Sequence, residues 1–294
     1  MISILIPVYN TDVRKLVSAL AEQAKDQSSV SEIIVLDDGS DSAVCRLNAA
    51  VASHLVQYHL SGANHGRIQA RKKLASLASN NWLLFLDDDS GIIRNGFLQT
   101  YCSAIPDPHT VVAGGRSYAE EKPPCAFRLH WLYGRSREGR WMQAANDFRG
   151  FQSNNFLVYR PVFEAIRFPE ALSGYGHEDT WMGMQLENMG CRMQKIDNPV
   201  VHQGLQRQEQ FLAKAEEALN NLPVLRRSAG DRQLAAHVKI FRAYRRLERW
   251  RLLTALQWLC AVCKGYIHRN IHSCTPSLRL FDLYRLGYLA KIFR

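Results

Sequence analysis

The chain has 294 residues, 47% hydrophobic and 22% charged, so it can form one large domain with an appendage, and its composition excludes a disordered protein. Its formal net charge of +10 is concentrated at one end. Residues 226–294 contain 15 Lys and Arg and three acidic residues, a net charge of +12, which leaves residues 1–225 at −2. A basic segment of this kind suits an anionic surface, such as phospholipid headgroups, a lipid-linked phosphate or nucleic acid.

The seven cysteines are odd in number and follow no regular spacing, so we expect reduced thiols in a cytosolic setting and no disulfide framework. Cys260 and Cys263 form a lone CxxC, which we interpret as two small apolar residues on a helix. The N-terminus lacks the basic region and cleavage site of a secretory signal. The longest uncharged run of the basic segment, residues 252–263, is short of the ~20 residues that span a bilayer. The sequence predicts a cytoplasmic protein, soluble or peripheral at the inner face of the cytoplasmic membrane.

Apolar runs alternate with helical patterns over the first 90 residues. The apolar runs predict strands at 2–8, 32–36, 56–59 and 82–86, and the helical patterns lie at 13–24, 43–55 and 66–79. This alternation with short loops predicts an α/β fold with a parallel sheet covered by helices on both faces. Ligands bind such sheets at the carboxyl ends of the strands.

The pattern loosens after residue 110. We expect strands at 111–115 and 156–159, an irregular segment at 116–150, helices at 161–166 and 179–190, and short extended pieces at 194–196 and 200–201. From residue 208 the chain reads as helical, with breaks near Pro223 and Pro276. The predicted organisation is a catalytic domain over 1–207, divided into a nucleotide-binding half at 1–110 and an acceptor half at 111–207, followed by a basic helical extension over 208–294.

Three consecutive aspartates, Asp87, Asp88 and Asp89, follow the apolar strand at 82–86. Repulsion makes three adjacent carboxylates costly unless a cation or solvent compensates. Carboxylates at a strand end, with positions open for phosphate oxygens and water, suit a hard divalent cation. A solvated acidic turn or a helix cap before Ser90 is the alternative interpretation.

Asp37 and Asp38 end another predicted strand in the same way, before Gly39 and Ser40. Both acidic clusters fall at carboxyl ends of strands in one sheet, so we expect them to share a site. A carboxylate at Asp38 can accept the N3–H of uracil, and Gly39 permits close backbone approach. A helix N-cap is the alternative, because Asp and Ser cap well.

Arg67 and Arg71 lie one turn apart on the predicted helix at 66–79 and share a face. An arginine near a helix N-terminus beside the acidic site can bind a diphosphate. A solvated basic face that includes Lys72 and Lys73 is the alternative.

The segment Gly-Tyr-Gly-His-Glu-Asp at 174–179 combines a flexible turn with two carboxylates at the start of a helix. Transfer to a hydroxyl group needs a general base, for which Glu178 and Asp179 are the candidates. Acids stabilised by the helix dipole are the alternative. His202, after the extended piece at 200–201, is either a metal ligand or a buried structural histidine.

The basic extension contains an amphipathic stretch over residues 241–250. Four arginines lie on one helical side, interleaved with apolar and aromatic residues: Arg242, Arg245, Arg246 and Arg249. The stretch suits a membrane surface at least as well as DNA, and a packing helix with a solvated basic side is the third interpretation. We expect residues 235–294 to bring the site close to anionic lipid, and we expect no nucleic-acid partner.

Together these motifs resemble the family 2 glycosyltransferases with the GT-A fold. The matching segments occur in the family's order over roughly residues 1–205, at 4–10, 35–40, 64–66, 70–71, 85–89 and 176–179. The resemblance implies a Rossmann-like, mostly parallel sheet with helices on both faces. The segment after about residue 210 matches no family motif and adds a helical C-terminal extension.

The resemblance also implies a role for each matching residue. It places Pro7 and Tyr9 at the nucleoside, Asp38 at uracil, Arg71 at the base or diphosphate, Asp87 and Asp88 at sugar and ribose, and Asn154 at the donor sugar. It makes Asp89 the ligand of a divalent cation, Mn or Mg, with His202 completing the metal site as in some related enzymes. It makes Asp179 the general base, beside Glu178, which positions acceptor or donor sugar.

The implied activity is inverting, metal-dependent transfer of one sugar from a UDP-sugar to a hydroxyl of a glycan or lipid-linked acceptor, of the bacterial surface-polysaccharide type. The Gln-x-x-Arg-Trp motif of processive synthases is absent, which predicts a non-processive enzyme. Lys72 departs from the asparagine that usually follows the Ala-Arg pair in this family. The alternatives are a sugar-phosphate nucleotidyltransferase, although its Gly-rich basic loop is replaced here by residues 7–10, and a nucleic-acid-binding protein acting through the basic tail.

Overall fold

A seven-stranded sheet forms the centre of the N-terminal part in the computed structural model, which describes residues 1–293. Its strands lie in the order β3 (Val56–Leu60), β2 (Val30–Asp37), β1 (Ile2–Val8), β4 (Trp82–Leu86), β8 (Asn155–Tyr159), β6 (Thr110–Ala113) and β9 (Arg192–Lys195). β3, β2, β1 and β4 run parallel, as do β6 and β9, whereas β8 is antiparallel to both neighbours. The predicted mostly parallel α/β sheet is confirmed.

Helices cover both faces of the sheet because its strands are apolar on both sides. In β1, Ile4 and Ile6 belong to the core under one face, and Leu5 belongs to the core under the other. The first core is closed by α1 (Arg14–Ala24) and α4 (Phe97–Ser103), and the second by α3 (Arg67–Leu77), α6 (Arg160–Ala165) and α7 (Glu178–Asn188).

A second, three-stranded sheet positions part of the site. β10 (Val200–His202) pairs antiparallel with β5 (Ser90–Gly91) and parallel with β7 (Arg116–Ser117). In this register His202 lies opposite Ser90, the residue that follows the aspartate triplet.

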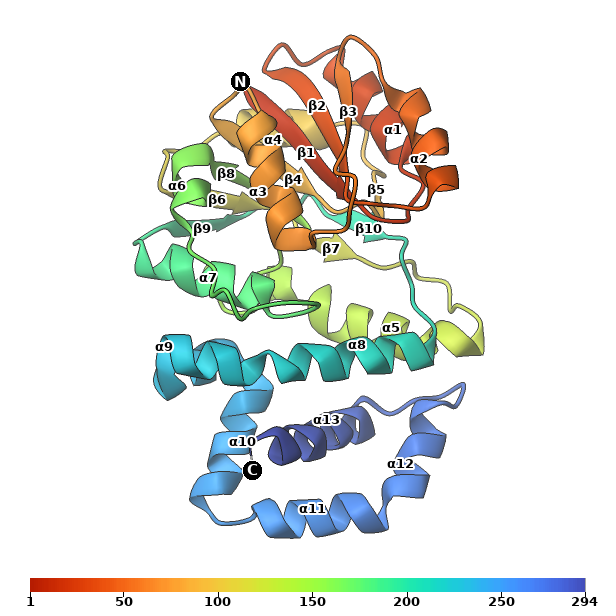
Figure 1. The fold of residues 1–294 in the computed structure, drawn as a ribbon, viewed down its shortest axis with the longest axis vertical. Helices are drawn as coiled ribbons and strands as arrows, with labels where there is room; N and C mark the ends of the chain where they lie inside the picture. The colour runs from red at the N-terminus through yellow and green to blue at the C-terminus, as the bar shows by residue number, and fades with distance from the viewer. Residues whose placement is uncertain (294) are drawn as a thin grey trace.

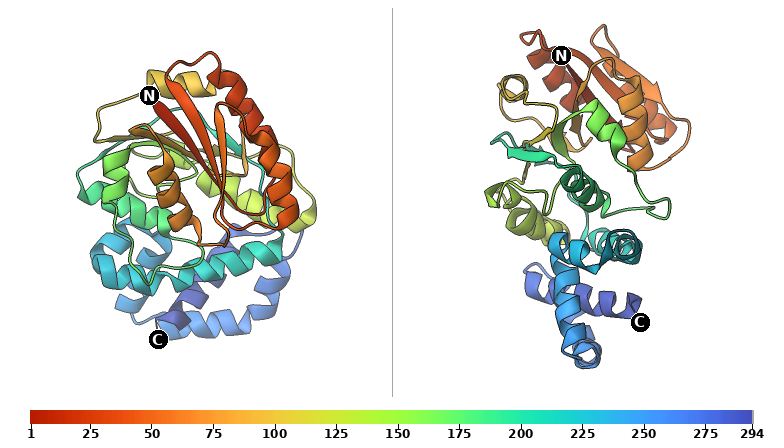
Figure 2. Two further views of the ribbon diagram at one scale, coloured as in Figure 1. Left: turned by 45° about the horizontal axis from the view of Figure 1, so that its top comes forward. Right: turned by 90° about the vertical axis from the view of Figure 1, so that its left-hand side faces the viewer.

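Helices form the C-terminal part, as the sequence predicted. They are α8 (Gln208–Asn220), α9 (Leu222–His237), α10 (Lys239–Arg249), α11 (Leu253–Val262), α12 (Lys264–Ile271) and α13 (Leu278–Ile292). The longest of them, α9, is broken at Gly230. Figure 1 shows them stacked below the sheet, and Figure 2 shows the same order from two other sides. Within residues 1–293, no helix is both long and apolar enough to cross a bilayer.

α7 joins the two parts through opposite faces. Met182 and Leu186 pack toward the sheet, whereas Trp181 and Met184 pack into the core of the C-terminal helices. A helix that is apolar on opposite sides must be covered on both, so the C-terminal helices complete the burial of an element that carries candidate catalytic residues.

Three helical segments differ from the expectation. The segment 116–150, expected to be irregular, contains α5 (Arg128–Tyr133), and α4 was not predicted. The helix expected at 43–55 is shorter, because α2 (Ser42–Asn48) passes into a 3₁₀ turn at Ala49–Val51. α5 is too short to be stable alone and is held by packing, since its Leu129 lies in one core with Leu212 of α8 and Phe281 of α13.

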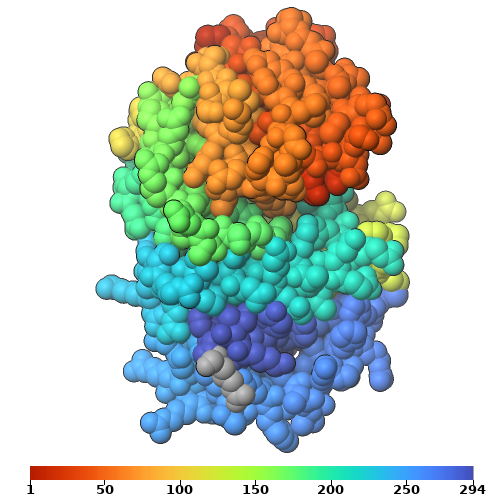
Figure 3. Space-filling view, viewed as in Figure 1, coloured from red at the N-terminus to blue at the C-terminus, as the bar shows by residue number. Residues whose placement is uncertain are grey.

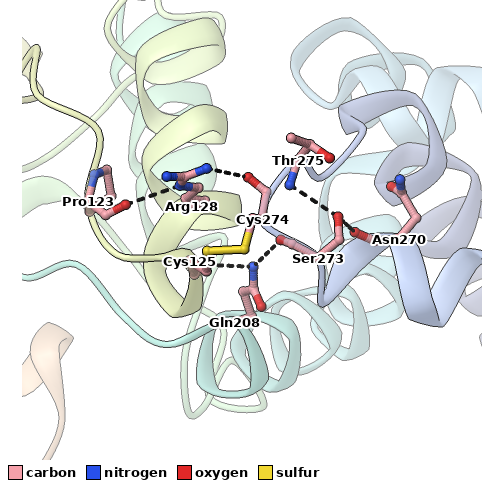
Figure 4. Close-up of a disulfide and its surroundings, with 8 residues drawn as sticks. All are labelled: Pro123, Cys125, Arg128, Gln208, Asn270, Ser273, Cys274 and Thr275. Carbon is pink, nitrogen blue, oxygen red and sulfur yellow. Dashed lines mark hydrogen bonds between the residues drawn. A yellow bond between two sulfur atoms is a disulfide. The ribbon is translucent and has the colours of Figure 1, made fainter.

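Cys125 and Cys274 form a disulfide, shown in Figure 4, so the expectation of reduced thiols was wrong for these two residues. They are 149 positions apart, and only the packing of α5 against the C-terminal helices brings them together. Side chains hold the same junction, since Arg128 donates to the Cys274 carbonyl (2.8 Å) and Gln208 to the Cys125 carbonyl (2.9 Å). The other cysteines are free thiols, including Cys260 and Cys263.

Candidate active site

The carboxyl ends of β1, β2 and β4 meet at one edge of the sheet, where both acidic clusters were expected. The backbone N–H of Tyr9, after β1, donates to Asp88 Oδ2 after β4 (3.1 Å). The N–H of Asn10 donates to Ser40 Oγ after β2 (2.8 Å). In the left view of Figure 2, β1 and β2 run from the N-terminus down toward α8.

Asp87 is neutralised by two arginines. Arg71 Nη2 lies 2.8 Å from its Oδ1, and Arg116 Nη2 lies 3.1 Å from its Oδ2. Arg71 is almost fully buried, and it also donates to the Ser153 carbonyl (3.2 Å). Part of the charge of the aspartate triplet is therefore compensated within the protein, and Asp87 and Arg71 orient each other.

Asp88 and Asp89 have opposite electrostatic environments. Burial, followed by the charge of Asp89, raises the pKa of Asp88 to about 6. Burial alone would raise the pKa of Asp89 as well, but His202, Arg116 and Arg67 lower it to about 2. Asp89 is therefore the carboxylate of this pair that stays ionised over the whole physiological range.

His202 lies beside Asp89, with Nδ1 3.2 Å from Oδ2 but not aligned for a hydrogen bond. The imidazole is buried, and neither ring nitrogen has a hydrogen-bond partner among residues 1–293. A buried imidazole without partners beside an ionised carboxylate fits a divalent cation. No third His, Cys, Asp or Glu of the described chain joins them in a ligand cluster, so phosphate oxygens and water would have to complete the coordination.

Asp179, at the start of α7, is connected to the triplet through Ser153. The Ser153 hydroxyl donates to Asp179 Oδ1, and the Ser153 carbonyl accepts from Arg71, which pairs with Asp87. Burial, followed by the charge of Glu178, raises the pKa of Asp179 to about 6. A carboxylate with a pKa close to neutrality is suited to general-base catalysis.

The turn before α7 fits closely against α8. Gly176 has a φ of 99°, and a Cβ at this position would lie 2.3 Å from the Cβ of Ala218. Glycine is therefore required both for the backbone conformation and for the close approach. The turn delivers Glu178, whose Oε1 lies 3.5 Å from Arg67 Nη1.

Asn154 and Asn155 have different environments although they are adjacent. The Asn155 side chain is bonded to Tyr101, Gly115 and Asn198. The Asn154 side chain is equally buried, but neither its oxygen nor its nitrogen has a partner among residues 1–293. The backbone carbonyl of Asn154 accepts from the backbone N–H of Asp87 (3.0 Å). The residue with the unsatisfied side-chain amide is therefore next to the aspartate triplet.

Asp38 and Asp37 hold loops at the edge of the site. The Asp38 carboxylate accepts from the N–H groups of His65 (3.1 Å) and Gly66 (2.8 Å), and Asp37 accepts from Ser40 and Tyr58. A contact between Asp38 and a nucleobase stays a prediction, to be made through its remaining lone pairs.

Pro7 and Tyr9, the residues predicted to contact the nucleoside, take different positions at the carboxyl end of β1. Pro7 is half-buried in β1 opposite Leu36, and Tyr9 is exposed just beyond the strand.

Sequence reasoning missed a buried polar group in the segment it read as irregular. Arg116 bridges Asp87 and Glu138, and the Tyr118 hydroxyl donates to Glu138. The ring of His130 lies 5.1 Å from that of His202, and burial, followed by His202, lowers the pKa of His130 to about 4. No motif marks these residues, because only the pairing of β7 with β10 brings them to the site.

Lys214 of α8 was also missed. Its Nζ lies 4.9 Å from the centre of the Tyr175 ring, which Arg67 also contacts. Burial, followed by the charge of Arg67, lowers the pKa of Lys214, and Asp89 and Asp88 are among the charges that act on it. The C-terminal extension thus contributes a cation to the edge of the site.

The sheet order, the acids at the strand ends and the second acid group on α7 are the features expected of a glycosyltransferase with the GT-A fold. The chain belongs to glycosyl transferase family 2, whose family profile matches residues 3–167. The family expected from the sequence motifs is thereby confirmed, and so is the enzyme class, a glycosyltransferase. No curated protein sequence gives a significant match.

Three solved structures illustrate the fold. The mannosyltransferase PcManGT from Pyrobaculum calidifontis, in complex with GDP-Man and Mn²⁺, has a TM-score of 0.57 and 15% identity, covering 99% of this chain and 86% of that chain. Mannosyl-3-phosphoglycerate synthase from Rubrobacter xylanophilus has a TM-score of 0.54 and 17% identity, covering 78% and 75%. Glucosyl-3-phosphoglycerate synthase from Mycobacterium tuberculosis, in complex with Mn²⁺, UDP and glucosyl-3-phosphoglycerate, has a TM-score of 0.52 and 14% identity, covering 76% and 78%. At these identities the likeness shows the fold alone.

Proposed function

We propose that this glycosyltransferase moves one sugar, with inversion, from a UDP-sugar to a hydroxyl of a glycan or lipid-linked acceptor in cell-surface polysaccharide synthesis. The observation that carries this proposal is the contrast between two carboxylates. His202 lowers the pKa of Asp89 to about 2, although its ring nitrogens make no hydrogen bond within residues 1–293, and burial raises the pKa of Asp179 to about 6. Acids whose environments separate their pKa values in this way divide binding and proton-transfer roles between them.

Asp89 and His202 are the residues that would hold a divalent cation, Mn²⁺ or Mg²⁺. A bound cation offsets the charge that a departing diphosphate gains. Because residues 1–293 offer two protein ligands here and no third, we expect the cation to bind tightly only together with the nucleotide. The Mn²⁺ in the P. calidifontis and M. tuberculosis structures supports the proposal that a divalent cation binds at this site.

Asp179 is proposed as the base that takes the proton from the acceptor hydroxyl. Ser153 fixes its carboxylate through one hydrogen bond, which leaves the other oxygen for the acceptor. Glu178, paired with Arg67, would position the acceptor or the donor sugar.

The donor would lie along the strand ends. Pro7, Tyr9 and Asp38 are proposed for the nucleoside, and Asn154 for the sugar through its unsatisfied amide. Asp88 is proposed for the ribose. Arg71 and Asp87 bond to each other, so we expect them to shape the site as a pair.

UDP is proposed as the nucleotide because a carboxylate at Asp38 can accept the N3–H of uracil. The P. calidifontis enzyme is in complex with GDP-Man, whereas the M. tuberculosis enzyme is in complex with UDP. Comparison of the two nucleotides is therefore part of the test.

Calorimetry with UDP and with GDP, each with and without Mn²⁺, tests the binding half of this proposal. Asp89→Ala should abolish the metal-dependent part of UDP binding, and Asp179→Asn should keep it but lose transfer and donor hydrolysis. Asp197→Ala is the matched control, because Asp197 is exposed and pairs only with Arg94 among the described residues. Full transfer by either site variant would refute its role, and tighter binding of GDP than of UDP would refute the donor assignment.

A further inference from the structure

The outward face of α11 is apolar although it lies at the end of the molecule. α11 contains no charged residue, and its side chains Trp258, Leu259 and Val262 are exposed, together with Tyr266 of α12. The exposed fractions of Trp258, Val262 and Tyr266 are 67%, 64% and 64%. Figure 1 shows α11 at the end opposite the sheet, and Figure 3 shows this part of the chain as the lower end of the surface.

The inward face of α11 is already satisfied. Leu256 is buried, and it lies with Leu253 and Cys260 in the core shared with α13. The exposed residues therefore form a second apolar side that this core does not need. Four large apolar side chains are exposed within residues 258–266, and such a concentration, unlike apolar residues exposed singly, marks a candidate interaction site.

Basic residues surround this face and acidic residues are absent from it. Residues 249–281 contain five Lys and Arg and no Asp or Glu. Arg249 and Arg251 precede α11, and Lys264 and Arg269 follow it, all with exposed side chains.

The arginines of α10 are in part occupied elsewhere. Arg245 pairs with Asp231 and Glu248. Arg242 donates to the backbone carbonyls of Ala235 and Ala236 in the last turn of α9. Two of the four arginines of the amphipathic stretch are therefore engaged within the protein, whereas Arg246 and Arg249 have exposed side chains.

We propose that α11 lies flat in the headgroup region of an anionic phospholipid membrane, with Trp258, Leu259, Val262 and Tyr266 as the inserted face. Ten residues of helix are about 15 Å long, enough to lie in the interface and too short to cross it. Trp and Tyr prefer this depth, and the flanking Lys and Arg side chains reach the phosphates. The inference deepens the proposed lipid-linked acceptor and rests on that proposed function for its biological meaning.

The charge pattern favours lipid over the other occupants of an apolar face. Two copies of this chain paired through α11 would bring basic rims together without a compensating acid from residues 249–281. Nucleic acid would contact the basic rim but leave the aliphatic face uncovered. An anionic membrane satisfies both parts at once.

Flotation with vesicles tests the proposal with the full chain. Vesicles of phosphatidylcholine with 30% phosphatidylglycerol are compared with vesicles of phosphatidylcholine alone. We expect binding to the anionic vesicles and at least tenfold weaker binding to the neutral ones. High salt should weaken this binding without abolishing it, because the apolar contact is not screened.

Variants on the exposed face locate the contact. Trp258→Ser/Val262→Ser should weaken binding on the order of tenfold or more, and Arg249→Gln/Lys264→Gln about 30-fold at low ionic strength. The matched controls are Ile93→Ser, an equally exposed apolar residue beside the sheet, and Lys15→Gln/Lys73→Gln. Both controls should bind like the wild type. Trp258→Phe should keep binding but remove most of the blue shift in tryptophan emission that accompanies it.

Three outcomes overturn the inference: vesicle binding that the α11 variants do not change, equal loss in the control variants, or a dimer in solution that Trp258→Ser/Val262→Ser dissociates. Donor hydrolysis without vesicles is measured on the same proteins. Normal hydrolysis with lost vesicle binding supports the inference. Absent hydrolysis with normal vesicle binding refutes the proposed function and leaves the docking surface in place.

Discussion

Asp89 Oδ2 lies 3.2 Å from His202 Nδ1, because β10 pairs with β5 immediately after the aspartate triplet. The pairing of β10 with β5 thus brings a histidine from far along the chain to Asp89, and the two side chains form a candidate metal site. The same small sheet brings Arg116 to Asp87. The geometry of the site therefore depends on contacts that no local pattern contains.

Replacement of His202 tests the metal site from its nitrogen side. His202→Gln removes one of the two proposed ligands, so the affinity for Mn²⁺ in the presence of UDP should fall about 10- to 100-fold. Electron paramagnetic resonance of free Mn²⁺ measures this directly. His109→Gln, at an exposed position, is the control. Unchanged Mn²⁺ affinity would exclude His202 as a ligand.

The raised pKa of Asp179 predicts the pH dependence of transfer. The base must be deprotonated, so the rate should fall about tenfold per pH unit below pH 6 and be constant above it. Ser153→Ala removes a hydrogen bond that lowers this pKa, so the midpoint should move to higher pH. pH–rate profiles of the wild type and of Ser153→Ala measure the two midpoints. A wild-type midpoint near pH 4, or the same midpoint in both proteins, would contradict the assignment of Asp179 as the base.

Deprotonation of Asp179, which should raise the transfer rate, should lower the stability of the protein. The folded-state pKa of this carboxyl group, about 6, exceeds the ordinary value of 3.8. Its contribution to folding is therefore present below pH 4 and is lost as the pH rises through 6. Asp179→Asn should consequently stabilise the protein at pH 8, by about 1–3 kcal/mol in urea unfolding, and should have little effect at pH 4. Destabilisation at pH 8 would show that the carboxylate is held favourably.

Arg116 is expected to be structurally important. Arg116→Gln leaves Glu138 without its cation and Asp87 with Arg71 alone, at a cost of about 3 kcal/mol. Glu138→Gln in the same chain should recover part of this loss, because it removes the unpaired charge. Urea unfolding of the two single variants and the double variant measures the coupling. Strictly additive effects would mean that the two side chains do not interact.

Lys214 tests whether the C-terminal extension takes part in catalysis. Lys214→Ala removes a cation whose charge acts on Asp88 and Asp89, so transfer should fall about tenfold to a hundredfold. Lys214→Arg should restore part of the activity, since the charge is retained. Steady-state transfer rates of both variants are measured with the same acceptor at the same concentration. Wild-type rates for Lys214→Ala would show that this lysine of the C-terminal extension does not take part in catalysis.

Reduction of Cys125–Cys274 should destabilise the protein without unfolding it. A disulfide across 149 positions contributes up to about 5 kcal/mol by restricting the unfolded chain. Arg128 and Gln208 still hold the junction afterwards. Urea unfolding with and without reductant measures the difference, and Cys125→Ser/Cys274→Ser should be insensitive to reductant. Equal stability of the wild type in both conditions would contradict the prediction.

The sequence by itself determined the sheet and the position of its acids. Residues 4–8, 33–36 and 82–86 are apolar runs within buried parallel strands, and the acids that follow the second and third of these runs must meet at one edge. Of the three short strands β5, β7 and β10, only β10 was expected as an extended piece, at 200–201, and none shows which strand it pairs with, because two or three residues show no periodicity.

Only the tertiary structure decided which of these groups interact. Arg116, Ser153 and Lys214 follow no motif, and their roles come from the neighbours that folding gives them. The disulfide likewise joins residues whose spacing says nothing of their contact. The physical reason is that local periodicity encodes burial and secondary structure, whereas the partner of a polar side chain depends on long-range packing. Burial of that side chain then fixes its charge state.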